Sequence, residues 1–281
     1  MFTGIGIGFV WGLLRLPYDT EFVPTLVMHV GAPFLIFSTL TKLTVDPAAF
    51  GIFAGYSVLA LAGMALVGAI LLRLLRYRVQ ENILPVTYPN AGNMGLPVSL
   101  YAFGEAGLAL GIAYFSVAAV SQFVLSPLVY LGRFSVVALL RMPTIWAIAI
   151  ALVFMTTDTG LPPWAANSVE LLGAITIPLM LFALGVSLTR IRVRNFRQAI
   201  ILTVLRLGLG IGVGFGLSWV FDLEGAARGV LILISSMPAA VFSYLFAATA
   251  DRSPEAIAGL VFTSTIVSFV TLPLLLALIL G

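Results

Sequence analysis

The sequence has very little charge. Only 9% of its 281 residues are Asp, Glu, Lys or Arg, whereas 61% are hydrophobic. A soluble domain usually carries about 25% charged residues, so this chain cannot cover a water-exposed surface and lipid must solvate most of it. Its 14 basic and 11 acidic residues are also too few to indicate nucleic-acid binding, and we expect no nucleic-acid partner.

Catalytic and metal-binding side chains are equally scarce. With no cysteine and 1 histidine, the chain cannot form disulfides, zinc–thiolate sites or a thiol nucleophile. It has no His-Glu-x-x-His motif, no paired Asp motif for polyprenyl chemistry and no nucleotide-binding motif. Lys42, its sole lysine, is expected in a loop between two spans, which leaves no Ser/Lys dyad. We therefore predict that the protein is not an enzyme and binds no metal or cofactor.

Long apolar stretches dominate the chain. A membrane-spanning helix needs about 20 mostly apolar residues, and breaks rich in charge, proline or glycine separate ten such candidates. They cover roughly residues 2–14, 23–43, 50–74, 82–103, 106–131, 143–158, 164–188, 197–221, 226–249 and 254–280. The first is too short to cross alone, and it lacks the basic start and cleavage site of a signal peptide.

The arginines predict an orientation for these spans. With the amino terminus outside, only Lys42 and Arg228 lie on the outer side. The cytoplasmic loops and their flanks then carry Arg15, Arg73, Arg76, Arg78, Arg133, Arg141, Arg190, Arg192, Arg194, Arg197 and Arg252. This asymmetry follows the positive-inside rule. We predict a multi-pass protein of the bacterial inner (plasma) membrane with both termini on the non-cytoplasmic side.

The chain also contains an internal repeat. The pattern Pro-x-x-x-Phe occurs at 33–37 and at 178–182, and Pro97 in the fourth span has a counterpart at Pro238 in the ninth. Two repeats of five spans, 1–132 and 133–281, must be inverted, because an odd number of crossings reverses the chain direction. Inverted repeats with paired broken helices are typical of secondary transporters.

The fourth span is interrupted where a helix should be continuous. Residues 83–97 include three prolines, two glycines and two asparagines. Each proline removes a backbone donor, and the freed groups cost several kcal/mol in hydrocarbon unless protein, water or a ligand satisfies them. Asn90 and Asn93 can both donate and accept hydrogen bonds. The helix that begins after the break points its positive end at the gap and favours an anion. The ninth span has a milder break at 235–240.

These breaks resemble those of a known family. Tyr-Pro-Asn-Ala-Gly-Asn-Met-Gly-Leu-Pro at 88–97 resembles the fourth-helix signature of the auxin efflux carrier family, which includes bacterial malonate permease-like members. Ser-Met-Pro-Ala-Ala-Val at 236–241, with Phe246-Ala247, is similar to the family's ninth helix. Ser264-Thr265 and Leu272-Pro273 resemble its last helix. The resemblance extends along almost the whole chain, and only the first helix is shorter than the family's.

The resemblance implies an all-α membrane fold of two inverted five-helix repeats, similar to sodium/proton antiporters and bile-acid symporters. Helices four and nine would cross at their non-helical middles, helices one, two, six and seven would form a scaffold, and the others a mobile bundle. Elevator-like movement and homodimerisation are implied as well. The substrate carboxylate would lie beside the crossing, with Asn90 as the first contact and Asn93 as the second. The residues that shape the crossing would be Pro89, Gly92, Gly95, Pro97, Met237, Pro238 and Ala239.

Four further polar residues are candidates for the substrate path or for coupling. Arg206 lies about nine residues inside the eighth span, where a charge either reaches the surface, pairs structurally or serves function. His29 is either a buried neutral histidine bonded to a helix carbonyl or a proton-coupling group. Ser38 and Thr41 could line an outer path or bond back to their own helix. In addition, two glycine rows, Gly4-Gly8-Gly12 and Gly208-Gly212-Gly216, predict helix-packing faces.

Three functions fit these observations. The first is a secondary transporter of a small organic anion, such as the dicarboxylate malonate or an auxin-like weak acid. The second is a sodium- or proton-coupled symporter of such an anion, which is less favoured because the spans contain few carboxylates to bind sodium. The third, from another class, is a membrane receptor that transports nothing.

Overall fold

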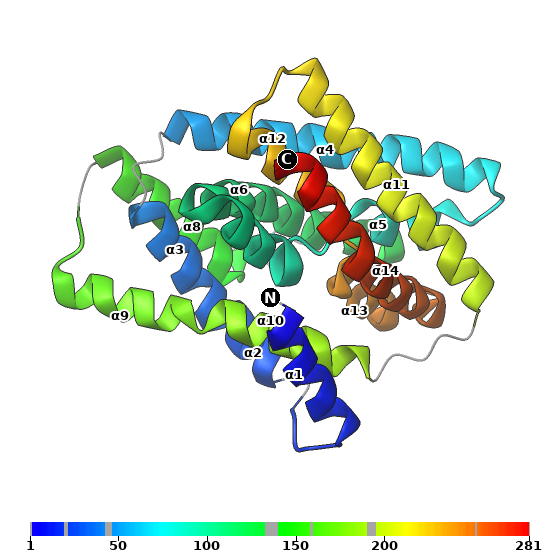
Figure 1. Ribbon diagram of the computed structural model, residues 1–281, viewed down its shortest axis with the longest axis horizontal. Coiled ribbons are helices and arrows are strands. Elements are labelled where there is room, and N and C mark those ends of the chain that lie inside the picture. The colour runs from blue at the N-terminus through cyan, green and yellow to red at the C-terminus, as the bar shows by residue number, and fades with distance from the viewer. Residues whose placement is uncertain are drawn as a thin grey trace.

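The computed structural model describes residues 2–19, 22–42, 47–132, 140–157, 160–189, 195–250 and 252–280. Within these ranges the regular elements are helices (Figure 1). Five of the described helical runs are long and apolar enough to cross a membrane by length and composition: Ala48–Leu74, Ala91–Leu131, Pro163–Leu188, Phe196–Val220 and Pro254–Leu280. This confirms an all-helical polytopic membrane protein.

One group of helices packs around the amino terminus. Within it, α1 packs along α10 and α3 packs against both α8 and α9 (Figure 1). Its members are α1 (Phe2–Leu13), α2 (Phe22–Leu26), the π-helix η1 (Val27–Gly31), α3 (Ala32–Lys42), α8 (Pro143–Thr157), α9 (Pro163–Ala174) and α10 (Thr176–Leu188). These are the segments that the resemblance assigns to the scaffold, and we call them the scaffold group.

The remaining helices form a second group, which we call the bundle group. Here α4 packs against α5, α6 and α11, while α11 packs against α12 and α14. Its members are α4 (Pro47–Leu74), α5 (Val79–Thr87), the π-helix η2 (Ala91–Gly95), α6 (Leu96–Leu131), α11 (Phe196–Val220), α12 (Gly225–Ser235), α13 (Val241–Thr249) and α14 (Pro254–Leu280). The two groups meet chiefly where α10 contacts η2 and where α3 and α8 contact α6.

The long helix α6 contains a reversal of backbone direction at Gly104. Its 36 residues would extend about 54 Å as a straight helix, far more than the roughly 30 Å of a bilayer's hydrocarbon. Gly104 has φ 64° and ψ −157°, a conformation that only glycine adopts readily. The break lies between the predicted spans 82–103 and 106–131, as expected for two crossings rather than one.

The first glycine row packs α1 closely against α10. A Cβ on Gly8 would lie 2.1 Å from the Phe182 carbonyl oxygen, and one on Gly185 would lie 2.1 Å from the Ile5 carbonyl oxygen. A Cβ on Gly12 would be only 2.3 Å from Thr189 Oγ1. Only glycine therefore allows these backbones to touch, which confirms Gly4-Gly8-Gly12 as a packing face.

The second glycine row was assigned to the wrong face. Among the described residues, no atom outside the neighbouring backbone lies within 4 Å of a Cβ built on Gly208, Gly212 or Gly216. The packing residues are instead Gly210 and Gly214, whose Cβ atoms would lie 1.9 Å from the Ser235 oxygen and 2.9 Å from the Ile232 Cα. Glycines alternate along this helix, so spacing alone could not tell which row meets protein and which meets lipid.

We expect Gly8→Ala to destabilise the protein and Gly6→Ala not to. Gly6 lies two residues earlier, on the opposite face of α1, and a Cβ built on it has no described atom of another segment within 4 Å. It lines an open apolar cavity of about 480 Å³ with Phe9, Leu188 and Phe269. Alanine at position 8 must push α1 off α10 and should cost about 1–3 kcal/mol. Thermal unfolding of both purified variants measures this difference, and equal melting temperatures would contradict it.

The segments just before the two Pro-x-x-x-Phe patterns approach each other closely. The π-helix η1 ends at Gly31, and α9 and α10 are separated at Ile175. A Cβ on Gly31 would lie 2.6 Å from Thr176 Oγ1, and one on Gly173 would lie 2.9 Å from the Leu35 Cα. The second and seventh predicted spans therefore cross where both are irregular.

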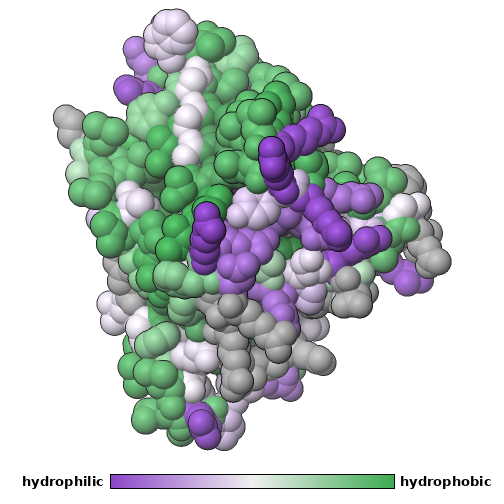
Figure 2. Space-filling model, turned by 90° about the vertical axis from the view of Figure 1, so that its right-hand side faces the viewer, coloured by the Kyte–Doolittle hydropathy of each residue, from purple (hydrophilic) through white to green (hydrophobic). Residues whose placement is uncertain are grey.

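Charged residues gather at one end of the molecule. The end of α4 and the starts of α5, α11 and α14 lie on the right of Figure 1, and Figure 2, which faces that side, shows hydrophilic residues gathered between hydrophobic flanks. The exposed arginines at these helix ends are Arg73, Arg76, Arg78, Arg197 and Arg252. All five belong to the set predicted to face the cytoplasm. Which compartment this end faces stays a prediction.

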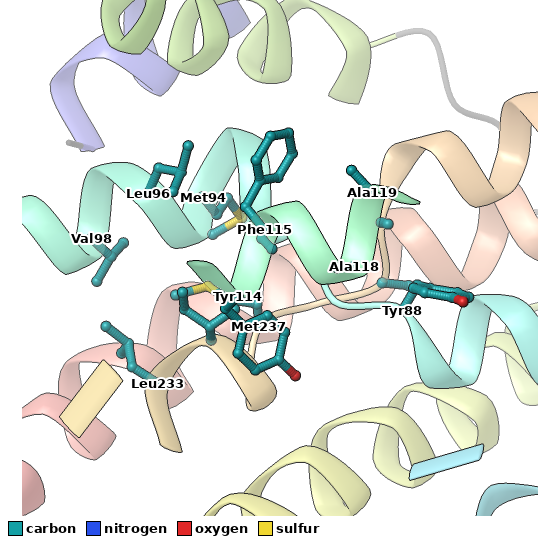
Figure 3. Packing of buried hydrophobic residues seen from close by; sticks show 14 of the residues in the cluster. Tyr88, Met94, Leu96, Val98, Tyr114, Phe115, Ala118, Ala119, Leu233 and Met237 are labelled. Atoms are coloured by element: carbon teal, nitrogen blue, oxygen red, sulfur yellow. The ribbon is translucent and has the colours of Figure 1, made fainter. Parts of the chain in front are cut away.

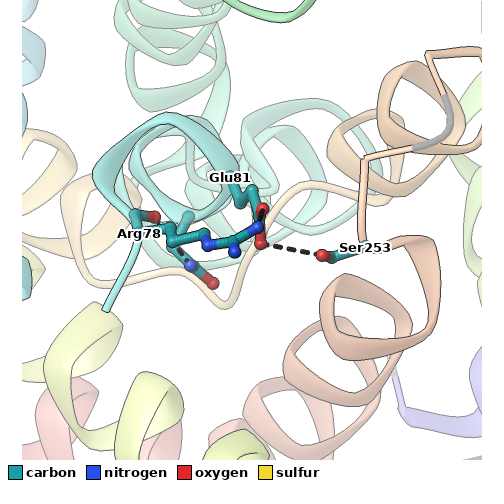
Figure 4. A network of polar contacts seen from close by, with 4 residues as sticks. Arg78, Glu81 and Ser253 are labelled. Carbon is teal, nitrogen blue, oxygen red and sulfur yellow. Dashed lines mark hydrogen bonds and ion pairs between the residues drawn. The ribbon is translucent and has the colours of Figure 1, made fainter. Parts of the chain in front are cut away.

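At the same end a carboxylate connects α5 to the start of α14. Glu81 accepts a hydrogen bond from Arg78 Nη1 at 3.0 Å and another from Ser253 Oγ at 2.8 Å (Figure 4). Ser253 precedes α14 directly. The hydrogen bond between Ser253 and Glu81 joins residues that are 172 positions apart. It therefore links the start of α14 to α5, the first part of the broken helix.

Candidate functional site

The first broken helix is unwound over three residues. Helix α5 ends at Thr87, and η2 begins at Ala91. Pro89 offers no N–H to continue the helix, and Asn90 takes φ −73° and ψ 60°. The chain then re-enters a helix through a wide turn, in which Gly95 N donates to the Asn90 oxygen at 3.0 Å. The predicted interruption is therefore present, and it is followed by a π-helix rather than directly by an α-helix.

The second broken helix is unwound around Pro238. Helix α12 ends at Ser235, and α13 begins at Val241. Ser236 N and Oγ both donate to the Ile232 oxygen, at 3.0 Å and 2.7 Å. These local bonds satisfy the Ile232 carbonyl in the last turn of α12, so the break is confined to the residues around the proline.

The two breaks cross and form an antiparallel bridge between Pro89 and Ala239. Asn90 N donates to the Pro238 oxygen at 2.8 Å, and Ala240 N donates to the Tyr88 oxygen at 3.0 Å. Each broken helix thus receives from the other the backbone hydrogen bonds that its own proline prevents. Buried backbone groups in lipid need such partners, and we call this arrangement the crossover.

A serine that we did not select from the sequence completes the crossover. Ala239 N donates to Ser264 Oγ at 3.1 Å, and Ser264 Oγ in turn donates to the Val261 oxygen at 3.2 Å. Ser264 lies in α14. Its only signal in the sequence was the Ser264-Thr265 pair of the resemblance, which carried no assigned role.

Several donors at the crossover remain unused. Asn90 is 4% exposed, and its Nδ2 has no hydrogen-bond partner among the described residues. Thr87 Oγ1, one turn earlier, is buried and equally unpartnered within the described chain. The backbone N–H groups of Gly92 and Asn93 form no backbone hydrogen bond to a described residue outside η2, as expected at a helix start. These donors suit a ligand with acceptor oxygens.

The accessible side of the crossover faces the scaffold group. Gly92 and Asn93 are half-buried, whereas Pro89, Gly95 and Pro97 are buried. A Cβ on Gly92 would lie 3.0 Å from Phe115 Cε2 and 3.5 Å from the Met180 Cε of α10. A Cβ on Gly95 would lie 3.4 Å from Ile234 of α12. Gly92 therefore lies where the two groups of helices meet, and Gly95 lies inside the bundle group.

Apolar side chains close the crossover on its other sides. Met94, Tyr114, Met237 and Ala239 are each fully buried, and Figure 3 shows the cluster to which the first three belong. In a low-dielectric surrounding, hydrogen bonds to an ionised ligand are stronger than in water. The donors of the crossover therefore lie in a low-dielectric surrounding.

Arg206 is buried behind the second break and does not reach the surface. Its side chain is 0% exposed. Nη2 donates to the Ser235 oxygen at 2.8 Å, and Nη1 lies 3.2 Å from Met64 Sδ. Ser235 Oγ is also 3.1 Å from the Tyr114 hydroxyl. Of the alternatives that the sequence leaves open, an Arg206 side chain that reaches the membrane surface is therefore wrong, because the end of α12 binds the guanidinium inside the protein.

The other polar candidates lie outside the crossover. Ser38 Oγ donates to the Leu35 oxygen at 3.0 Å, and Thr41 Oγ1 donates to the Phe37 oxygen at 2.7 Å, so both hydroxyls are satisfied by their own helix. His29 is exposed, with Nδ1 3.0 Å from the Thr25 oxygen. The predicted carbonyl contact of His29 is correct, but its predicted burial is wrong, because Val27 and Gly31 form the buried face of η1.

Comparisons with known proteins agree with this geometry. The family model described as membrane transport protein matches residues 127–276, which include the second break and most of α14. An uncharacterized transporter of Methanothermobacter thermautotrophicus is 29% identical over 192 residues, covering 66% of this chain and 63% of that relative. An uncharacterized transporter of Methanocaldococcus jannaschii is 26% identical over 282 residues, covering 94% of this chain and 91% of that relative. The chain belongs to the membrane transport protein family, that of the auxin efflux carriers.

Proposed function

We propose that this protein is a secondary transporter of a small organic anion and that it binds the substrate carboxylate at the crossover. The observation that carries the proposal is Asn90, a 4%-exposed amide whose Nδ2 has no partner among the described residues. A buried donor without a partner costs about 1–3 kcal/mol, and a carboxylate oxygen would satisfy it. The unpaired N–H groups of Gly92 and Asn93 lie in the next turn and would add two further donors.

The electrostatics of the crossover favour a negative ligand. Helix starts carry a partial positive charge, and both η2 and α13 begin at the crossover. The ends of α5 and α12 lie there too and carry partial negative charge, so the full positive charge of Arg206 behind the second break decides the sign. A carboxylate, as in malonate or an auxin-like weak acid, would meet this net positive potential and the unpartnered donors of the crossover.

The packing pattern supports two inverted repeats of five spans, 1–132 and 133–281. In that scheme α1 and α8 correspond, as do the pairs α4 and α11, α5 and α12. The contact of α1 with α10 in one half matches that of α8 with α3 in the other. Likewise, α4 contacts α6 and α5, and its counterpart α11 contacts α14 and α12. The antiparallel bridge between Pro89 and Ala239 would then lie on the pseudo-two-fold axis. Such symmetry is the basis of alternating access in many carriers.

The burial of the crossover supports an elevator-like movement. Asn90 and Ala239 are almost or fully enclosed, so a substrate reaches them only when the scaffold and bundle groups move apart. The scaffold group touches the crossover through few elements, chiefly α10, which contacts η2. We further propose that the scaffold group forms the interface of a homodimer in the inner membrane, with both chain termini outside.

A binding experiment on purified protein tests the proposed function. Malonate, acetate and an aromatic weak acid are compared with the uncharged isostere malonamide in a thermal-unfolding assay. A carboxylate at 100 times its Kd should stabilise the protein by about 2.7 kcal/mol, whereas malonamide should not. Flux of the best ligand into proteoliposomes, with and without sodium or a pH gradient, then separates uncoupled from coupled transport. No shift and no flux with any carboxylate would favour a non-transporting receptor.

A further inference from the structure

Arg206 replaces a hydrogen bond that the second break removes. In a continuous helix the Ser235 carbonyl would accept from the N–H four residues later, which belongs to Ala239. That N–H donates to Ser264 Oγ instead. The Ser235 oxygen accepts from Arg206 Nη2 at 2.8 Å, so a side chain from α11 completes the carboxyl-terminal end of α12.

The guanidinium is held there without a counter-ion. Among the described residues, no carboxylate pairs with Arg206; its polar neighbours are the Ser235 carbonyl, Met64 Sδ and the Tyr114–Ser235 hydroxyl pair. Burying an unpaired charge is costly, but the end of a helix carries a partial negative charge that offsets part of this cost. Nε of Arg206 has no partner in the described chain, which leaves the charge incompletely neutralised.

The corresponding place in the first half has no charge. Arg206 lies on α11 and contacts Met64 on α4, and these helices correspond in the proposed repeats. Thr87 ends α5 as Ser235 ends α12, and its Oγ1 is unpartnered in the described chain. The crossover therefore has one fixed positive charge, at the second break only.

We propose that Arg206 is a resident cation that holds the carboxyl-terminal end of α12 in the place where carriers with broken helices bind a mobile cation, and that its fixed charge selects anionic substrates. It acts through the field at the crossover and through Ser235, as a positioning residue rather than a substrate contact. This inference rests on the proposed function, since it assigns that site its charge preference. It also implies that carboxylate binding needs no sodium at this break.

The test compares Arg206→Lys, which keeps the charge, with Arg206→Gln, which keeps a hydrogen-bond donor but no charge. Arg228→Gln serves as the control, because it removes the same charge from the exposed surface of α12. Malonate binding and thermal unfolding are measured for each purified protein in sodium and in choline chloride. Even at a separation of about 12 Å and an effective dielectric constant near 20, loss of the charge should weaken malonate binding on the order of tenfold.

The expected result is binding by the wild type, Arg206→Lys and Arg228→Gln that is equal in both salts, with Arg206→Gln about tenfold weaker. Wild-type affinity in Arg206→Gln, or a sodium requirement in the wild type, would overturn the inference. If the wild type binds no carboxylate, the proposed function fails, and the order of melting temperatures decides the inference. Arg206→Lys above Arg206→Gln supports a resident cation, whereas equal melting temperatures, as expected if only a donor to Ser235 is needed, or the reverse order would overturn it.

Discussion

Asn90→Ala is expected to weaken carboxylate binding by roughly 10- to 150-fold, the equivalent of losing one hydrogen bond to a charged group, about 1.5–3 kcal/mol. The fold should not suffer, because Nδ2 has no partner among the described residues to lose. The backbone bond from Asn90 N to the Pro238 oxygen is kept by any residue except proline. Binding and thermal unfolding of the same purified variant therefore separate the loss of function from any loss of stability.

Two matched variants sharpen this expectation. Asn90→Asp keeps the shape of the side chain but adds a negative charge at the crossover, so it should lose anion binding at least as fully as alanine does. Asn93→Ala removes a half-buried amide beside it and should have a smaller effect, because its backbone N–H remains. Unchanged malonate affinity in Asn90→Ala would place the substrate elsewhere in the molecule.

Gly210→Ala should be among the most damaging single-methyl substitutions in this chain. The added Cβ would lie 1.9 Å from the Ser235 oxygen and 2.9 Å from the Ser236 Cα, both of which are backbone atoms that cannot rotate away. Helix α11 must then move off α12, and the bond from Arg206 Nη2 to that same oxygen lengthens or breaks. We expect a loss of about 3 kcal/mol, together with weakened anion binding.

The matched control for this substitution is Gly212→Ala. It lies two residues along the same helix, and no atom from the rest of the described structure lies within 4 Å of its built Cβ. Alanine there should be neutral or stabilise the helix by up to about 1 kcal/mol. Thermal unfolding of the two variants should consequently give shifts of opposite sign or of very different size. A similar shift in both would mean that α11 and α12 do not pack as described.

The broken helices were predictable because proline and glycine act locally. Pro89 and Pro238 remove backbone donors wherever the chain runs, so the sequence predicts the interruptions within 83–97 and 235–240. The first is confined to 88–90, because Pro85 lies inside α5 and Pro97 in the first turn of α6, where proline is tolerated. The mutual hydrogen bonds of the two breaks could not be predicted, because the register of a bridge depends on how two distant segments meet. Ser264 could not be selected from the sequence either, because a serine in an apolar span usually bonds back to its own helix and nothing local shows that Ala239 lies beside it.

The sequence predicted least well which face of each helix packs against protein. In α11 the glycines at 208, 210, 212, 214 and 216 form two interleaved rows, and the contacts select 210 and 214. Arg206 could not be placed either, because a long side chain one-third of the way into a span can turn to either end. For His29, the position along the span was mistaken for depth inside the protein, although its side chain points outward.

The bridge between Pro89 and Ala239 also constrains how the protein is made. Its two strands are about 150 residues apart in the sequence, and ribosomes add roughly 5–20 residues per second. For something like 8–30 s after the first break enters the membrane, the Tyr88 carbonyl and the Asn90 N–H therefore lack their final partners. Until the second break is synthesised, these two groups need water in the insertion machinery, or another protein, as temporary hydrogen-bond partners. Neither half of the chain can form the bridge alone, so the fourth span reaches its final conformation only after the ninth has been made.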